Sequence, residues 1–179
     1  MGDCRVDGPD SPPVQSPEEM VGRFQAELMT ALADWKQRLK NDPAALGALE
    51  QEVQAAFSRG AGLLIVGLLA VVMKNAPLEQ ATERTRRGFA YRLTRGKARQ
   101  IRVRLLGGLV IWITSLYCAP RPSRREEEGK VPGAYVELAQ FGFAKGCSPA
   151  LESKVARQAA LCPSLELARQ ELARDGMAL

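Results

Sequence analysis

The sequence predicts an α+β protein that is mainly helical and has one small antiparallel β-hairpin in the middle of the chain. Before residue 75, two long stretches place apolar residues three and four positions apart, which is the period of an amphipathic helix. Between residues 101 and 105, apolar and cationic residues alternate. Two adjacent glycines and an apolar, β-branched run then follow, which is typical of two strands joined by a turn. Nearer the C-terminal end, Ser148 and Ser164 each precede a helical pattern and resemble helix caps.

The length and composition are those of a globular protein. The chain has 179 residues, of which 46% are hydrophobic and 25% are charged, and this suits one domain of ordinary size or two small ones. We divide it into a leader, a helical hairpin, a basic segment with a β-hairpin and a loop, and a helical region that resembles a partial helix-turn-helix. These four parts are expected at residues 1–15, 16–76, 77–132 and 133–179.

The first two parts are predicted from their breaker residues and apolar stripes. The leader is rich in Gly and Pro and has few apolar side chains, so we expect it to be disordered. Ser16-Pro17 followed by Glu19 predicts a helix start, and Asn41-Asp42-Pro43 predicts a break and a second start. The expected stripes are Met20, Phe24, Leu28, Leu32, Trp35 and Leu39 in the first helix, and Leu46, Leu49, Val53, Phe57, Leu64, Leu68 and Val71 in the second.

The second helix contains a stretch without charge that could be read as a membrane span. It runs from Gly60 to Met73, which is 14 residues, whereas a span needs about 20. We therefore expect no membrane contact and interpret this stretch as a buried core helix or a helix-pairing face. Gly60 and Gly67 would allow close approach of a partner helix, which could come from a second copy, so residues 17–74 are a candidate homo-oligomer interface.

The β-hairpin is predicted from alternation and turn chemistry. Arg102 and Arg104 alternate with apolar neighbours, Gly107-Gly108 is a hairpin turn signal, and the return strand runs from Leu109 toward Cys118. We expect a loop at 119–132, where three glutamates partly neutralise the arginines, and a short helix from Gly133 to Gln140. The two short helices after Ser148 and Ser164 fit either the opening of a helix-turn-helix unit or an ordinary helical hairpin.

The positive charge is concentrated in the middle of the chain. The net charge is +5, but residues 60–130 carry 14 basic and 5 acidic side chains, whereas residues 1–59 carry 6 basic and 10 acidic ones. One stretch has nine basic residues and no acidic one: Arg84, Arg86, Arg87, Arg92, Arg95, Lys97, Arg99, Arg102 and Arg104. It is a candidate binding surface for a polyanion such as DNA, and the alternative is a solvated face that keeps the protein soluble. Because the strand continues this run, we expect the arginines to end on a β-hairpin rather than along a helix.

Several classes of chemistry are excluded or disfavoured by composition. The chain has no histidine, which removes Ser-His-Asp and Cys-His mechanisms and the usual mixed zinc sites. The four cysteines form no CxxC pair and no disulfide pattern, so we expect no metal, no cofactor and a reducing, cytoplasmic location. Asp34, Asp42 and Asp175 are explained by capping or solvation, and no phosphate-binding or nucleophile motif is present, so an independent enzyme is the weakest hypothesis.

One family resemblance adds to this interpretation. It is carried by these segments: Leu116-Tyr117-Cys118, Gly133 to Gly142, Ser148-Pro149-Ala150-Leu151 through Val155-Ala156, and Ala168 to Leu172 with Gly176. Over roughly residues 45–179 the chain resembles the N-terminal region of bacterial insertion-sequence transposases of the Kra type, which belong to the DDE superfamily. Many relatives have a CxxC zinc knuckle where Cys118 stands, but the partner position is Arg121, so the resemblance supports no zinc site.

The resemblance implies a DNA-binding and assembly part of a transposase-like protein, truncated or split from its catalytic domain. In that family the DDE nuclease domain lies further downstream, and its three carboxylates and two metal ions have no counterpart in this sequence. We therefore assign no catalytic residue and expect no enzymatic activity from this chain. The alternative function is a helical protein-interaction module, formed by residues 17–74, without a role in nucleic-acid binding.

Overall fold

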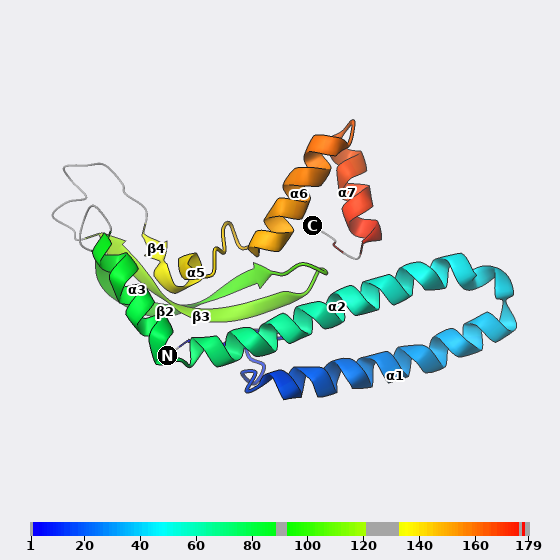
Figure 1. Cartoon of the computed structure of the whole chain (residues 1–179), viewed down its shortest axis with the longest axis horizontal. Coiled ribbons are helices and arrows are strands. Elements are labelled where there is room, and N and C mark those ends of the chain that lie inside the picture. Colours follow the sequence, from blue (N-terminus) through cyan, green and yellow to red (C-terminus); the bar gives the residue numbers. More distant parts are fainter. Residues whose placement is uncertain (1, 89–92, 121–132, 176, 178–179) are drawn as a thin grey trace.

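The computed structural model describes residues 2–88, 93–120, 133–175 and 177, and it confirms the predicted mainly helical α+β class. A long helical hairpin lies along one side of a small antiparallel sheet, and a shorter helix pair lies near the tip of the central β-hairpin (Figure 1). The helices are α1 (Pro17–Asn41), α2 (Leu46–Met73), α3 (Ala76–Gly88), α5 (Val136–Gln140), α6 (Pro149–Leu161) and α7 (Leu165–Arg174). The strands are β1 (Cys4–Val6), β2 (Leu93–Arg104), β3 (Val110–Pro120) and β4 (Ala134–Tyr135).

The predicted helix starts are confirmed by their cap contacts. The Ser16 hydroxyl accepts a hydrogen bond from the Glu19 N–H at 3.3 Å. The Asp42 carboxylate accepts one from the Ala44 N–H at 3.0 Å, at the start of a short 3₁₀ turn that leads into α2. Ser148 and Ser164 cap α6 and α7 in the same way. These side chains supply acceptors for backbone donors that have no partner inside the helix.

Helix α2 buries a different face from the stripe that its sequence suggested. The side chains that pack toward the sheet include Leu63, Val66 and Ala70, which are at most 2% exposed. By contrast, Leu64 and Leu68 from the predicted stripe are 39% and 58% exposed. Because α2 is apolar on nearly all sides after Gly60, periodicity alone could not select the face that the sheet covers.

Two glycines of α2 bring it close to α1 of the same chain. A Cβ built on Gly67 would lie 2.5 Å from the Pro17 Cα, and one built on Gly60 would overlap the Phe24 ring. The expected partner helix is therefore α1, and these two glycines do not serve a second copy. Helix α2 continues through both positions, from Leu46 to Met73.

The sheet is built around β3, which pairs antiparallel with the other three strands. Gly107 and Gly108 both have positive φ in the turn between β2 and β3, as the hairpin prediction requires. The register places Arg104 opposite Val110 and Ile101 opposite Ile113. Ile111 and Ile113 are 0% exposed and belong to the same core cluster as Leu63 and Val66 of α2. The inner face of the sheet is therefore the one that packs on α2.

The prediction of a disordered leader over residues 1–15 is wrong for the residues that the structure describes. Strand β1 pairs with β3, placing Cys4 opposite Ile113 and Val6 opposite Ile111. Cys4 and Val6 are 0% and 3% exposed, and burial raises the pKa of the Cys4 thiol to about 12. The few apolar side chains of the leader are enough to order it, because β1 pairs with β3 at an edge of the sheet and buries them there.

Two further predictions need correction in the second half of the chain. Asn75-Ala76-Pro77 ends α2 as expected, but it also begins α3, which was not predicted. The short helix expected from Gly133 begins only at Val136, because Ala134 and Tyr135 pair with β3 as strand β4. The predicted loop at 119–132 lies almost wholly outside the described residues. The predicted pair of tail helices, α6 and α7, is confirmed.

Within the described residues, one helical segment is long and apolar enough to cross a membrane by length and composition. It spans residues 43–73, and its most apolar window has a mean hydropathy of 2.0.

We predict that Gly67→Ala destabilises the protein by about 1–3 kcal/mol, because the new methyl group would force α1 and α2 apart. Gly47→Ala is the matched control in the same helix, since nothing lies within 4 Å of a Cβ at that position. The control should be neutral or stabilising by up to about 1 kcal/mol. Urea unfolding followed by circular dichroism measures both; equal effects would contradict the close packing at Gly67.

We also predict a pH-dependent contribution from the ion pair that ties the leader to α1. Asp7 accepts from Arg23 through both carboxylate oxygens, at 2.6 and 2.8 Å, and these hydrogen bonds lower the pKa of Asp7. Asp7→Asn should cost about 0.2–1 kcal/mol at pH 7, because the pair is partly exposed to solvent. Since the folded-state pKa is depressed, this contribution is present above pH 4 or so and is lost on acidification through the lowered value. Urea unfolding of both proteins at pH 7 and near pH 2.5 checks whether the difference disappears.

Candidate nucleic-acid interface

The nine predicted basic residues are divided by the structure between a helix and a strand. Arg84, Arg86 and Arg87 lie on α3, whereas Arg95, Lys97, Arg99, Arg102 and Arg104 lie on β2. Arg92 lies outside the described residues. The expectation that the run ends on a strand is confirmed by the β2 residues. Its first three arginines lie on a helix that was not predicted, because the Asn75-Ala76-Pro77 start adds a helix before the strand.

Helix α3 exposes two of its arginines. Arg84 is exposed, and Arg87 has a side chain that is 78% exposed and pairs with Glu83 one turn earlier at 3.1 Å. Residues three positions apart project from neighbouring parts of one helix surface, so Arg84 and Arg87 share a side of α3. This helix could have been found in the sequence from Pro77 at its second position and from Glu79 in its first turn.

On β2, Arg99 is held over an aromatic ring, a contact that was not predicted from the sequence. The Arg99 guanidinium carbon lies 4.8 Å from the centroid of the Tyr117 ring. The Tyr117 hydroxyl accepts a hydrogen bond from the Gly133 N–H at 3.1 Å, and its ring centroid lies 5.0 Å from that of Tyr135. The cation–π contact orients an exposed arginine. This contact could have been predicted from the Gly107-Gly108 turn. The turn fixes the register of the hairpin, which places Arg99 opposite Ser115 and makes Tyr117 its diagonal neighbour.

Arg102 and Arg104 lie on the outer face of the sheet, away from α2. They alternate with Val103, which is buried on the inner face. Arg102 is exposed and lies opposite Trp112, which is half-buried. Arg104 is half-buried, and its backbone bonds to the segment before α6: its N–H donates to the Gly146 carbonyl at 2.8 Å. Arg99 belongs to the opposite face by alternation, so the strand presents guanidinium groups on both sides.

The arginines of the helical hairpin differ from those of β2 in their electrostatic environment. Arg23, Arg38 and Arg59 all pair with carboxylates of α1, α2 or the leader, at distances of 2.6 to 3.5 Å. Among the described residues, no carboxylate lies within ion-pair distance of Arg99 or Arg102. The exposed arginines of β2 are thus the ones whose charge is not neutralised by a described neighbour.

The tail helices carry charges that are largely paired with one another. Lys154 of α6 pairs with Asp175 at 2.6 Å, and within α7 Arg169 pairs with Glu166 and Arg174 with Glu171. Leu151 and Leu172 are buried where this pair packs against the tip of the β-hairpin. The tail therefore adds little unpaired positive charge to the surface of β2.

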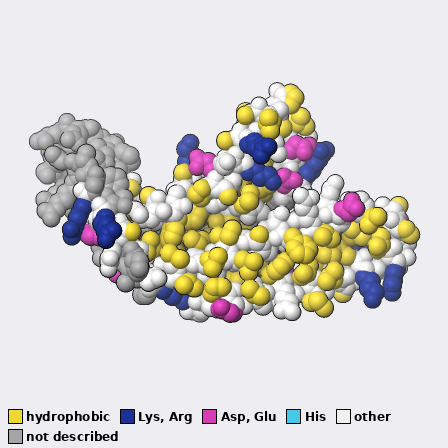
Figure 2. All heavy atoms as spheres, viewed as in Figure 1, with side chains coloured by type: hydrophobic (Ala, Val, Ile, Leu, Met, Phe, Trp, Pro, Cys, Tyr) yellow, Lys and Arg dark blue, Asp and Glu magenta, His cyan; other side chains and the backbone are white. Residues whose placement is uncertain are grey.

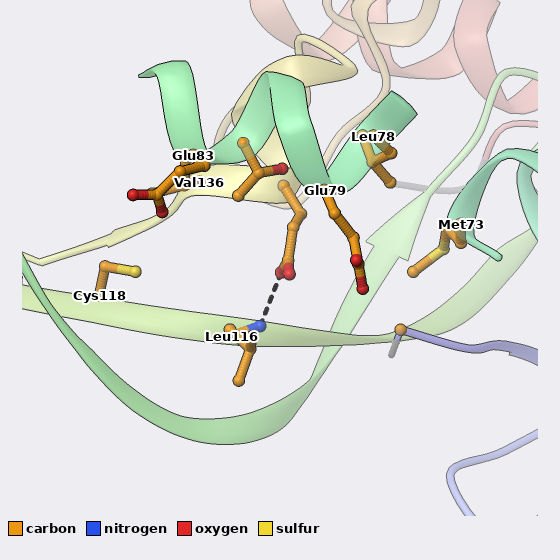
Figure 3. Close-up of a pocket in the computed structure, with 10 residues that line it drawn as sticks. Met73, Leu78, Glu79, Glu83, Leu116, Cys118 and Val136 are labelled. Carbon is orange, nitrogen blue, oxygen red and sulfur yellow. Dashed lines mark hydrogen bonds between the residues drawn. The ribbon is translucent and has the colours of Figure 1, made fainter. Parts of the chain in front are cut away.

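A separate pocket of about 190 Å³ lies between α3, β3 and α5 (Figure 3). Its lining includes three carboxylates, from Glu79, Glu83 and Glu137. The Glu137 carboxylate accepts hydrogen bonds from the Ser115 hydroxyl and, at 2.7 Å, from the Leu116 N–H. Among the described residues no three His, Cys, Asp or Glu side chains are grouped so that they could hold a metal ion. An acidic wall repels phosphate, so this pocket does not extend the basic surface.

Comparison with known proteins identified no relative of this chain. No protein-family model, no curated protein and no solved structure matches the chain. The resemblance to Kra-type transposases therefore stays a prediction from the quoted segments, and the geometry of the basic residues is the basis for the function proposed below.

We predict that Glu137→Ala destabilises the fold by about 1–3 kcal/mol, because it leaves the buried Ser115 hydroxyl and the Leu116 N–H without their acceptor. Glu152→Ala, an exposed carboxylate on α6, is the control and should change stability by less than about 0.5 kcal/mol. Thermal and urea unfolding measure both variants. A neutral effect of Glu137→Ala would mean that this carboxylate is not needed to hold α5 on the sheet.

Proposed function

We propose that this chain is the DNA-binding and assembly part of a transposase-like protein and that it carries no catalytic centre of its own. The observation that supports DNA binding best is the contrast between the arginines of the two halves. Those of the helical hairpin are neutralised within the chain, while Arg99 and Arg102 on β2 are exposed without a described carboxylate partner. Exposed guanidinium groups of this kind suit the phosphates of a nucleic acid.

The position of β2 in the sheet supports the same proposal. Strand β2 lies at an edge of the sheet beside β3, and Arg102 lies on the outer face away from α2, so the phosphate backbone of a nucleic acid could lie along this edge. Arg84 on α3 extends the positive charge beyond the strand. Contacts of this kind would position the protein on the phosphate backbone without selecting a base sequence.

The main test is the salt dependence of binding to a generic DNA duplex. We expect measurable binding at about 50 mM salt and a linear fall of log K with log salt concentration. Arg99→Ala/Arg102→Ala should weaken binding and reduce the magnitude of the slope by about two, since each lost phosphate contact removes roughly 0.9. Fluorescence anisotropy with a labelled duplex measures both quantities, and circular dichroism checks that the hairpin remains folded.

A charge-matched control separates local contact from net charge. Lys40→Ala/Lys74→Ala also removes two positive charges, but Lys40 lies at the end of α1 and Lys74 directly after α2, outside the sheet. This control should leave the slope of the wild-type chain unchanged. No binding at 50 mM salt, or equal losses in the two double variants, would refute the proposal and favour a protein-interaction module without a nucleic-acid role.

A further inference from the structure

The helical hairpin has an exposed apolar side that nothing in the chain covers among the described residues. We call this surface the outer apolar face. Figure 2 shows hydrophobic side chains spread over both helices of the hairpin on the side in view. The outer apolar face consists of side chains that are 38–63% exposed: Val21, Met29, Leu32 and Leu39 of α1, and Phe57, Leu64, Ile65, Leu68, Val71 and Val72 of α2.

The two stripes lie on the same side of the hairpin. In each helix the exposed apolar residues are centred about a quarter of a turn from the residues that contact the other helix, such as Phe24 in α1 and Gly67 in α2. Because α1 and α2 are antiparallel, rotation in the same sense from the contact line leads to the same side. The sheet packs on the other side of α2, through Leu63 and Val66. The outer apolar face is therefore one continuous surface that points away from the core.

The area of this face matches what a stable protein–protein interface needs. Ten side chains that are about half exposed offer about 500 Å² of apolar surface, if roughly 100 Å² is taken for each fully exposed side chain. Since about 60% of a typical interface is non-polar, this corresponds to about 800 Å² per partner. That is the usual size of a specific interface, and it is at the upper end of the patches that monomers leave exposed.

Two exposed charges beside the stripe on α1 are complementary to each other. Glu18 precedes Val21, and Lys36 follows Leu32, and both side chains are exposed. They are 18 residues apart, which is five full turns, so they project from the same side of α1 about 27 Å apart. A second α1 that lies antiparallel across this face would bring each Glu18 to the Lys36 of the other copy. This pattern is self-complementary, as a two-fold interface requires.

A lipid bilayer fits the same face less well. Although α2 is apolar enough to span, α1 carries eight charged residues over its 25 positions, and they include Asp34, Lys36 and Lys40 on exposed positions. Placing the hairpin in a bilayer would bury these charges in hydrocarbon. Association with a second protein surface leaves them at the rim in water.

We propose that the outer apolar face binds a second copy of this chain, so that two helical hairpins pack face to face as a two-fold symmetric four-helix bundle. In this dimer α1 lies antiparallel to its counterpart, and Glu18 of each copy pairs with Lys36 of the other. The proposal does not depend on DNA binding and can be tested without nucleic acid.

The first experiment measures the mass of the full chain by sedimentation velocity between 1 and 100 μM. We expect twice the 19.5 kDa of one chain at the higher concentrations. Leu68→Glu should raise the dissociation constant at least about ten-fold, because it places two charges within the apolar interface. Leu165→Glu is the matched control on α7, where the side chain is 76% exposed and outside the face, and it should leave the dimer intact.

The second experiment tests the antiparallel arrangement by charge reversal. Glu18→Lys and Lys36→Glu should each weaken the dimer by about 2- to 30-fold, since each creates two like-charge contacts per dimer. The double variant Glu18→Lys/Lys36→Glu should restore the wild-type constant. Circular dichroism confirms that each variant keeps its helices, so this pair remains informative even if Leu68→Glu fails to fold.

Three outcomes would overturn the proposal. A wild-type mass of one chain at 100 μM would exclude a dimer of useful affinity. Failure of the double variant to restore association would exclude the antiparallel arrangement of α1. Flotation of the chain with phosphatidylcholine vesicles, abolished by Leu68→Glu but not by Leu165→Glu, would assign the face to a membrane surface instead.

Discussion

The packing of α2 against the inner face of β3 is the contact that positions the elements around it. Ile111 and Ile113 of β3 and Leu63 and Val66 of α2 are all 0% exposed and lie in one core cluster. Full burial of such a side chain contributes roughly 1.5–3 kcal/mol, so these four form a large part of the driving force. Strand β3 in turn pairs with β1, β2 and β4, and the thiol of Cys4 in β1 lies 3.6 Å from the Val66 carbonyl. The leader, the basic strand and α5 are therefore all anchored to one strand and one helix.

This arrangement leaves one apolar face of α2 exposed. After Gly60, α2 is apolar nearly all round and gives one side to the sheet and one to α1, but the described residues include no third element that covers the remaining side. Gly60 and Gly67 lie where α2 comes closest to α1, against Phe24 and Pro17. Larger apolar side chains such as Leu64 and Leu68 are exposed on the remaining side.

The charges follow the same division of the molecule. In the helical hairpin, carboxylates of α1 and α2 and the leader Asp7 neutralise the arginines, as in the pair between Arg38 and Glu52 at 2.7 Å. On β2, Arg102 lies on the outer face of the sheet and Arg99 on the other face, and their described cross-strand neighbours on β3 are apolar or hydroxylated. One half of the molecule is thus suited to contacts with apolar protein surfaces and the other to contacts with a polyanion. The two proposed roles use separate surfaces and do not compete.

The sequence by itself determined the local structure of this protein. The caps at Ser16, Asp42, Ser148 and Ser164, the Gly-Gly turn and the alternation of β2 act over a few residues, so they could be read without knowledge of the fold. Helix α3 was missed although its Pro77 start is equally local. Only the tertiary structure decided which face of α2 is buried, because the sequence offers apolar residues on several sides and the sheet selects among them. Tertiary structure also ordered the leader, whose Cys4 and Val6 gain burial from pairing with a strand more than 100 residues away, and it placed Arg99 over Tyr117. These outcomes depend on long-range packing and register, which no short sequence pattern encodes.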